Sequence, residues 1–230
     1  MEKEEGVILS TDESKIVLFE FIGFCISVLF FYIPYLSIWT VDFSKVNLIN
    51  FILFIIMLFL GMQTHELLHG VGFIIFGKVQ LKNLKFGIKY KEAILYTHCI
   101  VPVKMKVYRI AILLPGIILG AIPSIVGLFL GNHWLVLYGV IMISGAATDF
   151  VVFWKSKEIE SQEYVIDHSN KIGFEIIKDT GGIDHFKRKA EKKTEENKIK
   201  HVKRGILSLI ILLIIIISFY YLGYFIGKYM

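Results

Sequence analysis

Two histidines and a glutamate in the stretch GMQTHELLHG, residues 61–70, have types and a spacing that point directly to chemistry. His65 and His69 are four residues apart, so on a helix their side chains lie one turn apart on the same face. Two imidazoles at that spacing can bind one zinc ion, because Zn–N bonds are about 2.0–2.1 Å long. Glu66 follows the first histidine, where its carboxylate can accept a proton from water, as in the HExxH pattern of zinc peptidases.

A third ligand is needed, because catalytic zinc has three protein ligands and one open position. Asp149 is the only carboxylate within residues 134–154. A helical rise of 1.5 Å per residue places it about 22 Å along its apolar segment, against about 25 Å for His65, so the two lie at matching depths. The small residues 145–147 just before it let another helix approach closely. We therefore expect Asp149 to complete the metal site.

Other assignments stay open at this point. Asp149 could instead pair with Lys155, and His98 is the next candidate for the third ligand. Another interpretation of the two histidines is a polar patch that hydrogen-bonds between helices. Ionisable residues inside a membrane are costly unless they pair or bind something, however, and this favours a functional site.

The composition indicates that these residues belong to a membrane protein. Hydrophobic residues make up 55% of the 230 residues and charged residues only 20%. A soluble domain of this size cannot bury so much apolar surface, and the apolar residues come in blocks long enough to cross a bilayer. The same figures exclude intrinsic disorder, collagen and disulfide scaffolds, and Cys25 and Cys99 supply neither a disulfide framework nor a CxxC pair.

The expected fold is an all-α membrane protein with about five transmembrane helices and a small β-hairpin on the cytoplasmic side. The apolar segments run roughly over residues 16–41, 46–77, 107–131, 133–154 and 205–227. The predicted organisation is a cytoplasmic N-terminus at 1–15, a four-helix membrane domain with HExxH and hairpin at 16–154, a cytoplasmic loop with a basic helix at 155–204, and a fifth transmembrane helix at 205–230. Residues 1–15 are charged and do not read as a cleavable signal peptide.

The distribution of basic residues predicts the orientation. Of the 25 Lys and Arg residues, all except Lys45 and Lys228 lie in residues 1–15, 78–109 or 155–204. Positive charge is retained on the cytoplasmic side of a membrane. We therefore expect a multi-pass protein of the cell (inner) membrane with its N-terminus in the cytoplasm and its C-terminus outside.

Two segments between the apolar blocks have patterns of their own. In LKFGIKYK, residues 84–91, apolar and polar residues alternate as in a half-buried strand, and AILYTHCIVPV, residues 93–103, is its expected partner. Residues 187–204 are strongly basic, which favours a solvated helix whose basic face could touch anionic lipid. No feature of the basic segments indicates a nucleic-acid partner.

Several short motifs together resemble the family of domains of unknown function named putative zincin peptidase. They are HELLHG, LLPG, SGAATD and DHSNKIGF, spread over about residues 61–177. In plan the chain is also similar to the site-2 proteases, which cut inside membranes. The resemblance implies that His65 and His69 are metal ligands, that Glu66 is the catalytic base and that Asp149 is the third ligand.

We therefore expect a zinc-dependent metallopeptidase of the HExxH type that hydrolyses peptide bonds of membrane-protein or membrane-proximal substrates. Zn²⁺ is the only cofactor expected. One alternative is a metal-binding transporter or sensor without peptidase activity, which would use the same histidines but not Glu66 as a base. Another is a scaffold protein in which HELLH is incidental. The sequence does not determine the substrate or the oligomeric state.

Overall fold

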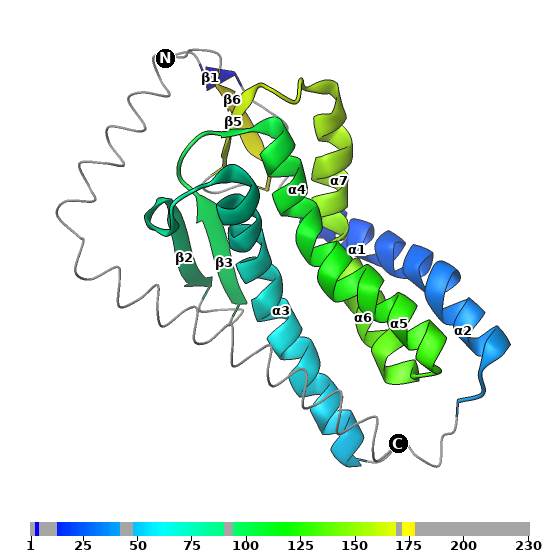
Figure 1. Cartoon of the computed structure of the whole chain (residues 1–230). Helices are drawn as coiled ribbons and strands as arrows, with labels where there is room; N and C mark the ends of the chain where they lie inside the picture. The colour runs from blue at the N-terminus through cyan, green and yellow to red at the C-terminus, as the bar shows by residue number, and fades with distance from the viewer. Residues whose placement is uncertain (1–2, 5–12, 42–47, 90–93, 169–171, 178–230) are drawn as a thin grey trace.

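The computed structural model describes residues 3–4, 13–41, 48–89, 94–168 and 172–177, which are mostly helical (Figure 1). The first apolar stretch comprises α1 (Glu13–Ser27), a π-helical turn η1 (Val28–Tyr32) and α2 (Ile33–Ile38). The second is the single helix α3 (Leu48–Gly77). The third comprises α4 (Met105–Pro115), the π-helical turn η4 (Gly116–Ala121) and α5 (Ile122–Leu130). The π turns fall beside prolines, because a proline lacks the N–H that the α-helical ladder needs.

The fourth apolar stretch is bent. It contains α6 (His133–Gly145) and α7 (Ala147–Lys155), followed by the short 3-10 helix η5 (Ser156–Glu158). The bend between the two helical parts is 47°. At Ala146, which lies between α6 and α7, the backbone has φ −87° and ψ 4° and leaves the helical conformation. The bend therefore turns the start of α7 relative to α6.

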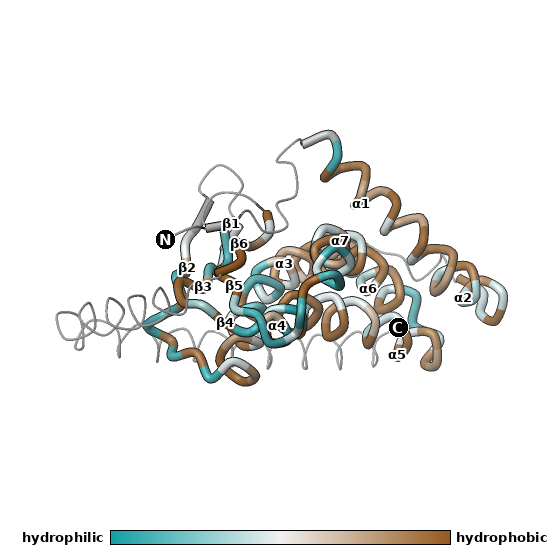
Figure 2. The backbone as a smooth tube through the Cα atoms, turned by 90° about the horizontal axis from the view of Figure 1, so that it is seen from above, coloured by the Kyte–Doolittle hydropathy of each residue, from teal (hydrophilic) through white to brown (hydrophobic). Residues whose placement is uncertain are grey.

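Within the described residues, three helices are long and apolar enough to cross a membrane: Lys15–Ile38, Leu48–Gly77 and Met105–Leu130. The bent pair makes a fourth if it is one span. Large apolar side chains on these helices face outward, for example Phe21 at 62% and Phe129 at 80% exposure, as expected for helices surrounded by lipid. Figure 2 shows α1 and α5 as mostly hydrophobic, whereas hydrophilic residues gather around the start of α4. The fifth span and the basic helix expected from the sequence lie outside the described residues.

The predicted hairpin is confirmed. Strands β2 (Leu84–Lys89) and β3 (Ile94–Cys99) pair antiparallel, with Leu84 opposite Cys99 and Phe86 opposite Thr97. The 3-10 turn η3 (Leu81–Asn83) connects the end of α3 to β2. In Figure 1 the hairpin lies against the half of α3 that contains the HExxH residues.

A second sheet goes beyond the all-α expectation. It contains β1 (Lys3–Glu4), β4 (Val103–Lys104), β5 (Tyr164–Asp167) and β6 (Phe174–Ile177). Its strand order is β1-β6-β5-β4, and β5 and β6 are antiparallel neighbours. Both sheets lie at the same end of the helices (Figure 1). The largest core cluster joins this end together, because Phe73 of α3, Cys99 of β3, Tyr108 of α4 and Phe174 of β6 are all members.

Glycines allow the helices around the site to approach closely. A Cβ atom on Gly72 of α3 would lie 2.7 Å from the Cα atom of Ala111 in α4. A Cβ atom on Gly23 of α1 would lie 2.8 Å from the Cβ atom of Ala147, and one on Gly116 would lie 3.2 Å from that of Ala146. Of the small residues expected to let other helices approach Asp149, Ala146 and Ala147 do so, whereas nothing lies within 4 Å of a Cβ atom placed on Gly145. The bend is thus contacted by α1 on one side and by η4 on the other.

Candidate metal centre

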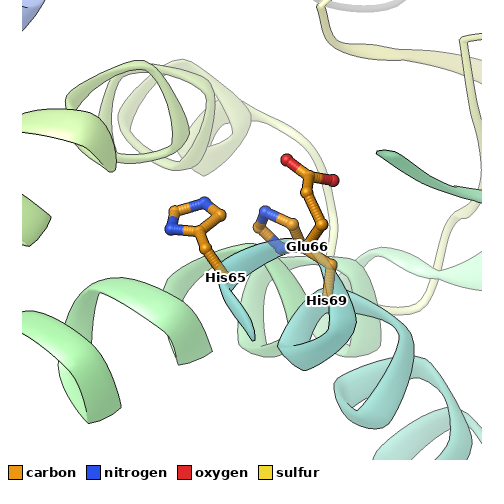
Figure 3. Close-up of side chains that lie close together, drawn as sticks. All are labelled: His65, Glu66 and His69. Atoms are coloured by element: carbon orange, nitrogen blue, oxygen red, sulfur yellow. The ribbon is translucent and has the colours of Figure 1, made fainter. Parts of the chain in front are cut away.

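Helix α3 presents the HExxH residues together. One ligand atom from each of His65, Glu66 and His69 can be chosen so that all three lie within 4.8 Å of one another. The imidazole ring centroids of His65 and His69 are 4.9 Å apart, with the ring planes at 80°. Figure 3 shows the two rings side by side and the Glu66 carboxylate beside them. Helical periodicity produces this arrangement locally, since residues i and i+4 share a face.

Asp149 comes to this site from α7. Its Oδ2 atom lies 3.0 Å from Nε2 of His65 and 3.6 Å from Nε2 of His69. The histidine side chains are 12% exposed and the Asp149 side chain is 19% exposed, so the group is largely shielded from solvent. These two histidine contacts are the polar contacts of the Asp149 carboxylate within the described chain, and Lys155 is not among its partners there.

The carbonyl group of Ala111 determines which nitrogen of His69 faces Asp149. Nδ1 of His69 lies 3.1 Å from the Ala111 carbonyl oxygen. A carbonyl only accepts hydrogen bonds, so Nδ1 carries the proton and donates it. Nε2 then keeps its lone pair, as metal-binding histidines require, with the backbone carbonyl orienting the ring.

The donor atoms fit zinc. Tetrahedral zinc with bonds of about 2.0–2.2 Å separates neighbouring donors by about 3.3 Å. The two distances from Asp149 Oδ2, 3.0 and 3.6 Å, lie on either side of that value. Two imidazole nitrogens and one carboxylate oxygen are the donor types that zinc takes, and three protein ligands leave one position open.

Glu66 is held by the hairpin. The backbone N–H of Thr97 donates to Oε2 of Glu66 at 3.1 Å, and the Thr97 hydroxyl donates to the Glu66 backbone carbonyl at 2.6 Å. The Glu66 carboxylate thus lies beside the histidines while one of its oxygens is engaged by β3. This suits a base that works next to a metal better than it suits a metal ligand.

His98, the alternative third ligand, makes a different contact. Its Nδ1 atom lies 3.0 Å from Oδ2 of Asp167, and the Tyr108 hydroxyl donates to Oδ1 of Asp167 at 3.4 Å. Of the other histidines, Nε2 of His168 lies 3.6 Å from Oε1 of Glu175, and His133 packs on Trp134. His185 and His201 are outside the described residues.

The two cysteines are separate from this site. Cys99 is fully buried in β3, where its thiol donates to the Val101 carbonyl oxygen. Burial raises the pKa of the Cys99 thiol to about 12. Cys25 is exposed on α1, within a candidate membrane span. Cys99 is therefore a packing residue, and a protonated buried thiol is a poor metal ligand.

Sequence reasoning did not identify Thr97 and Ala111 as parts of the site. Ala111 acts through its own backbone carbonyl. Thr97 acts through its backbone N–H and through a hydroxyl that donates to the backbone carbonyl of Glu66. The side-chain types of these two residues therefore gave little signal. The alternating pattern of residues 84–91 located the hairpin near the site. The pairing of Thr97 with Glu66 depends on how the hairpin docks on α3, which no local pattern records.

The fold and the site define a mostly helical protein with helices long and apolar enough to span a membrane, and with a HExxH cluster joined by a carboxylate from another helix. The model of the family described as putative zincin peptidase matches residues 58–162. The resemblance noted in the sequence is therefore confirmed over that segment, which includes His65, Glu66, His69, the hairpin and Asp149. The family name implies a zinc-dependent peptidase. No curated protein and no solved structure matches the chain.

Proposed function

We propose that this protein is a membrane-embedded zinc metallopeptidase that hydrolyses peptide bonds of membrane-protein or membrane-proximal substrates. The observation that carries the proposal is the position of Asp149. Its Oδ2 atom contacts Nε2 of His65 from a position 84 residues further along the chain, and it also lies 3.6 Å from Nε2 of His69. A shared metal ion would explain why three donor atoms converge in a place that is largely shielded from solvent.

In this proposal His65, His69 and Asp149 hold the zinc ion through Nε2, Nε2 and Oδ2. Bound there, zinc would supply a Lewis acid that makes water more acidic and polarises the scissile carbonyl. The Ala111 carbonyl keeps the His69 ring in the required tautomer. Placement of Asp149 at the start of α7 also favours its negative charge, because the N-terminal end of a helix is electropositive.

Glu66 moves the proton. Its carboxylate lies beside the two imidazoles, and among the described residues its hydrogen bond comes from Thr97 and not from either imidazole. It would accept a proton from the attacking water and pass it to the leaving amine nitrogen as the peptide bond breaks. A glutamine at this position retains the shape but cannot accept the proton.

The substrate has to be extended where it is cut, because a membrane helix satisfies its own backbone hydrogen bonds. Strand β3 offers an edge next to the catalytic group. The N–H of Thr97 points to Glu66 and not to β2, so in an antiparallel pair this side of Thr97 is the outer edge of the hairpin. An extended segment that follows this edge would pass beside Glu66.

The proposed topology places this end of the helices at the cytoplasmic side. Residues 78–106, which contain the hairpin, and residues 155–177, which contain most of the second sheet, then lie together on that side. The basic segment 187–204 would lie on the same side, where it could meet anionic lipid. Nucleic acid is not part of the proposal.

A metal-binding transporter or sensor remains the competing function, because the three donor atoms would serve it equally well. Glu66 separates the two, since only a peptidase needs it as a base. The experiment uses full-length protein in detergent, with zinc content measured by mass spectrometry and cleavage measured on fluorescein-labelled casein, an unfolded polypeptide.

Wild-type protein is expected to retain zinc and to cleave casein, whereas His65→Ala loses both properties. Glu66→Gln is expected to retain zinc while its cleavage rate falls by about 10²–10⁴-fold. Retained zinc with no cleavage in the wild type would favour the transporter or sensor. Equal cleavage by wild type and Glu66→Gln would contradict the peptidase mechanism.

A further inference from the structure

Thr97 is attached to Glu66 by two hydrogen bonds from the same residue. Its N–H donates to the Glu66 carboxylate, and its hydroxyl donates to the Glu66 backbone carbonyl. We propose that Thr97 is the positioning residue that orients the Glu66 carboxylate for proton transfer. This inference rests on the proposed peptidase function and adds a residue that HExxH does not contain.

The hydroxyl bond requires the strand to come very close to the helix. Gly70 lies one turn after Glu66 on α3, directly under the strand. A Cβ atom there would lie 3.2 Å from Cγ2 of Thr97 and 3.3 Å from the Phe86 ring. Because glycine leaves that space empty, the Thr97 hydroxyl reaches within 2.6 Å of a carbonyl inside the helix. The last residue of HELLHG thus creates the place where Thr97 docks.

The next residue of the strand is held from another direction. Nδ1 of His98 lies 3.0 Å from Oδ2 of Asp167 in β5, and Asp167 also accepts from Tyr108 of α4. Adjacent residues of a strand point to opposite faces, so Thr97 and His98 hold β3 from its two faces. The amide that binds Glu66 is therefore part of a strand with little freedom to move.

The contact with Thr97 restricts the conformation of the Glu66 side chain. A free glutamate side chain on a helix samples several rotamers, and only some place its carboxylate beside the metal ligands. The Thr97 amide fixes Oε2 at 3.1 Å and leaves Oε1 to receive the proton. Catalytic groups lose rate steeply when displaced by about 1 Å, so holding one oxygen raises the rate of proton transfer without taking part in it.

The test compares Thr97→Val with Thr97→Ser in full-length protein. Valine keeps the shape and the backbone N–H but removes the hydroxyl donor, whereas serine keeps the donor. Thr64→Val is the matched control, because the Thr64 hydroxyl also donates to a helix carbonyl, that of Leu60, on the same helix. Gly70→Ala is a second variant that pushes β3 away from α3. Zinc content, kcat and KM for fluorescein-labelled casein are measured for each.

Thr97→Val and Gly70→Ala are expected to lower kcat by about tenfold or more while zinc content and KM stay within about twofold of wild type. Thr97→Ser and Thr64→Val are expected to retain wild-type kcat. If the wild type cleaves casein and the kcat of Thr97→Val is unchanged or higher, the proposed role of Thr97 is overturned but the proposed peptidase function is not. The same applies if Thr97→Val loses zinc, or if Thr97→Ser fails to restore kcat. A wild type that does not cleave casein overturns the proposed function and this role with it.

Discussion

The Nδ1 atom of His69 lies 3.1 Å from the carbonyl oxygen of Ala111, and this contact joins the HExxH helix to α4. The contact exists because Gly72, three residues further along α3, lets the α4 backbone approach within contact distance. A backbone carbonyl cannot rotate away as a side chain can, so it is a rigid partner for the imidazole. The direction of the His69 ring is thus determined by helix packing as well as by the HExxH spacing.

Gly72→Ala should therefore weaken the site from a distance. The added Cβ atom would lie 2.7 Å from the Cα atom of Ala111, which only a shift of α3 or α4 can relieve. We expect lower thermal stability and a zinc affinity lower by about 10–100-fold, the range found when partners that orient metal ligands are removed. Zinc competition with a chelator measures the change.

Gly145→Ala is the control for that substitution. Gly145 lies at the end of α6 near the bend, yet nothing lies within 4 Å of a Cβ atom placed there. We expect wild-type stability and zinc affinity, because alanine fits the space and favours the helix. Equal losses in Gly72→Ala and Gly145→Ala would show that close packing of α4 on α3 does not orient His69.

Asp149→Ala is expected to lower zinc retention strongly, because it removes one of three donors. Asp149→Asn keeps the shape and a neutral oxygen but loses the charge, so its affinity should lie between those of wild type and Asp149→Ala. Zinc content after dialysis against a chelator measures the series. If Asp149→Ala retained zinc like wild type, Asp149 would be a hydrogen-bond partner of His65 and not a ligand.

Reactivity should distinguish the two cysteines. Burial raises the pKa of Cys99 from 9.0 to about 12, and the thiolate is the form that reacts. N-ethylmaleimide at pH 7.5 should leave Cys99 unmodified in folded Cys25→Ala protein and modify it after unfolding in detergent. A charged maleimide should also fail to label Cys25 in vesicles, because Cys25 is exposed on a candidate span, where lipid would surround it. Mass spectrometry measures each adduct.

The same pKa predicts a dependence of stability on pH. The neutral thiol is the form that the folded core accommodates. The contribution of Cys99 to stability is therefore complete below about pH 9 and is lost as the pH rises towards 12. Cys99→Ala should show less of this alkaline destabilisation than wild type in thermal unfolding measured between pH 9 and 11.

The orientation can be tested with reporter fusions. Reporters in residues 1–15, 78–106 and 155–204 are expected in the cytoplasm, and a reporter after Met230 is expected outside. The reason is the concentration of Lys and Arg in the first three segments. A cytoplasmic C-terminus would mean that the number of spans is even and that the fifth span, which lies outside the described residues, does not cross.

The sequence by itself determined the features that depend on local periodicity. The spacing of His65 and His69 places both rings on one helix face whatever the rest of the chain does. Alternation along residues 84–91 was sufficient to predict the hairpin, because a strand repeats every two residues. The apolar blocks gave the candidate spans for the same reason, since bilayer thickness sets their length.

The position of Asp149 was determined partly by the sequence and partly by the tertiary structure. Its depth along the fourth segment follows from the rise per residue, so the sequence could place it level with His65. The side of the helix that it occupies depends on the bend at Ala146 and on the packing of Gly23 and Gly116 against that bend. The contact with His65 therefore depends on how α1, α3, η4 and α7 pack together.

Only the tertiary structure decided the partners that fix the site. Ala111 reaches His69 because α3 and α4 cross at Gly72, and Thr97 reaches Glu66 because the hairpin docks over Gly70. The second sheet likewise joins Lys3–Glu4 to Phe174–Ile177, segments from opposite ends of the described chain. These contacts depend on how separate elements pack and in what register, and neither is encoded in the periodicity of any single element.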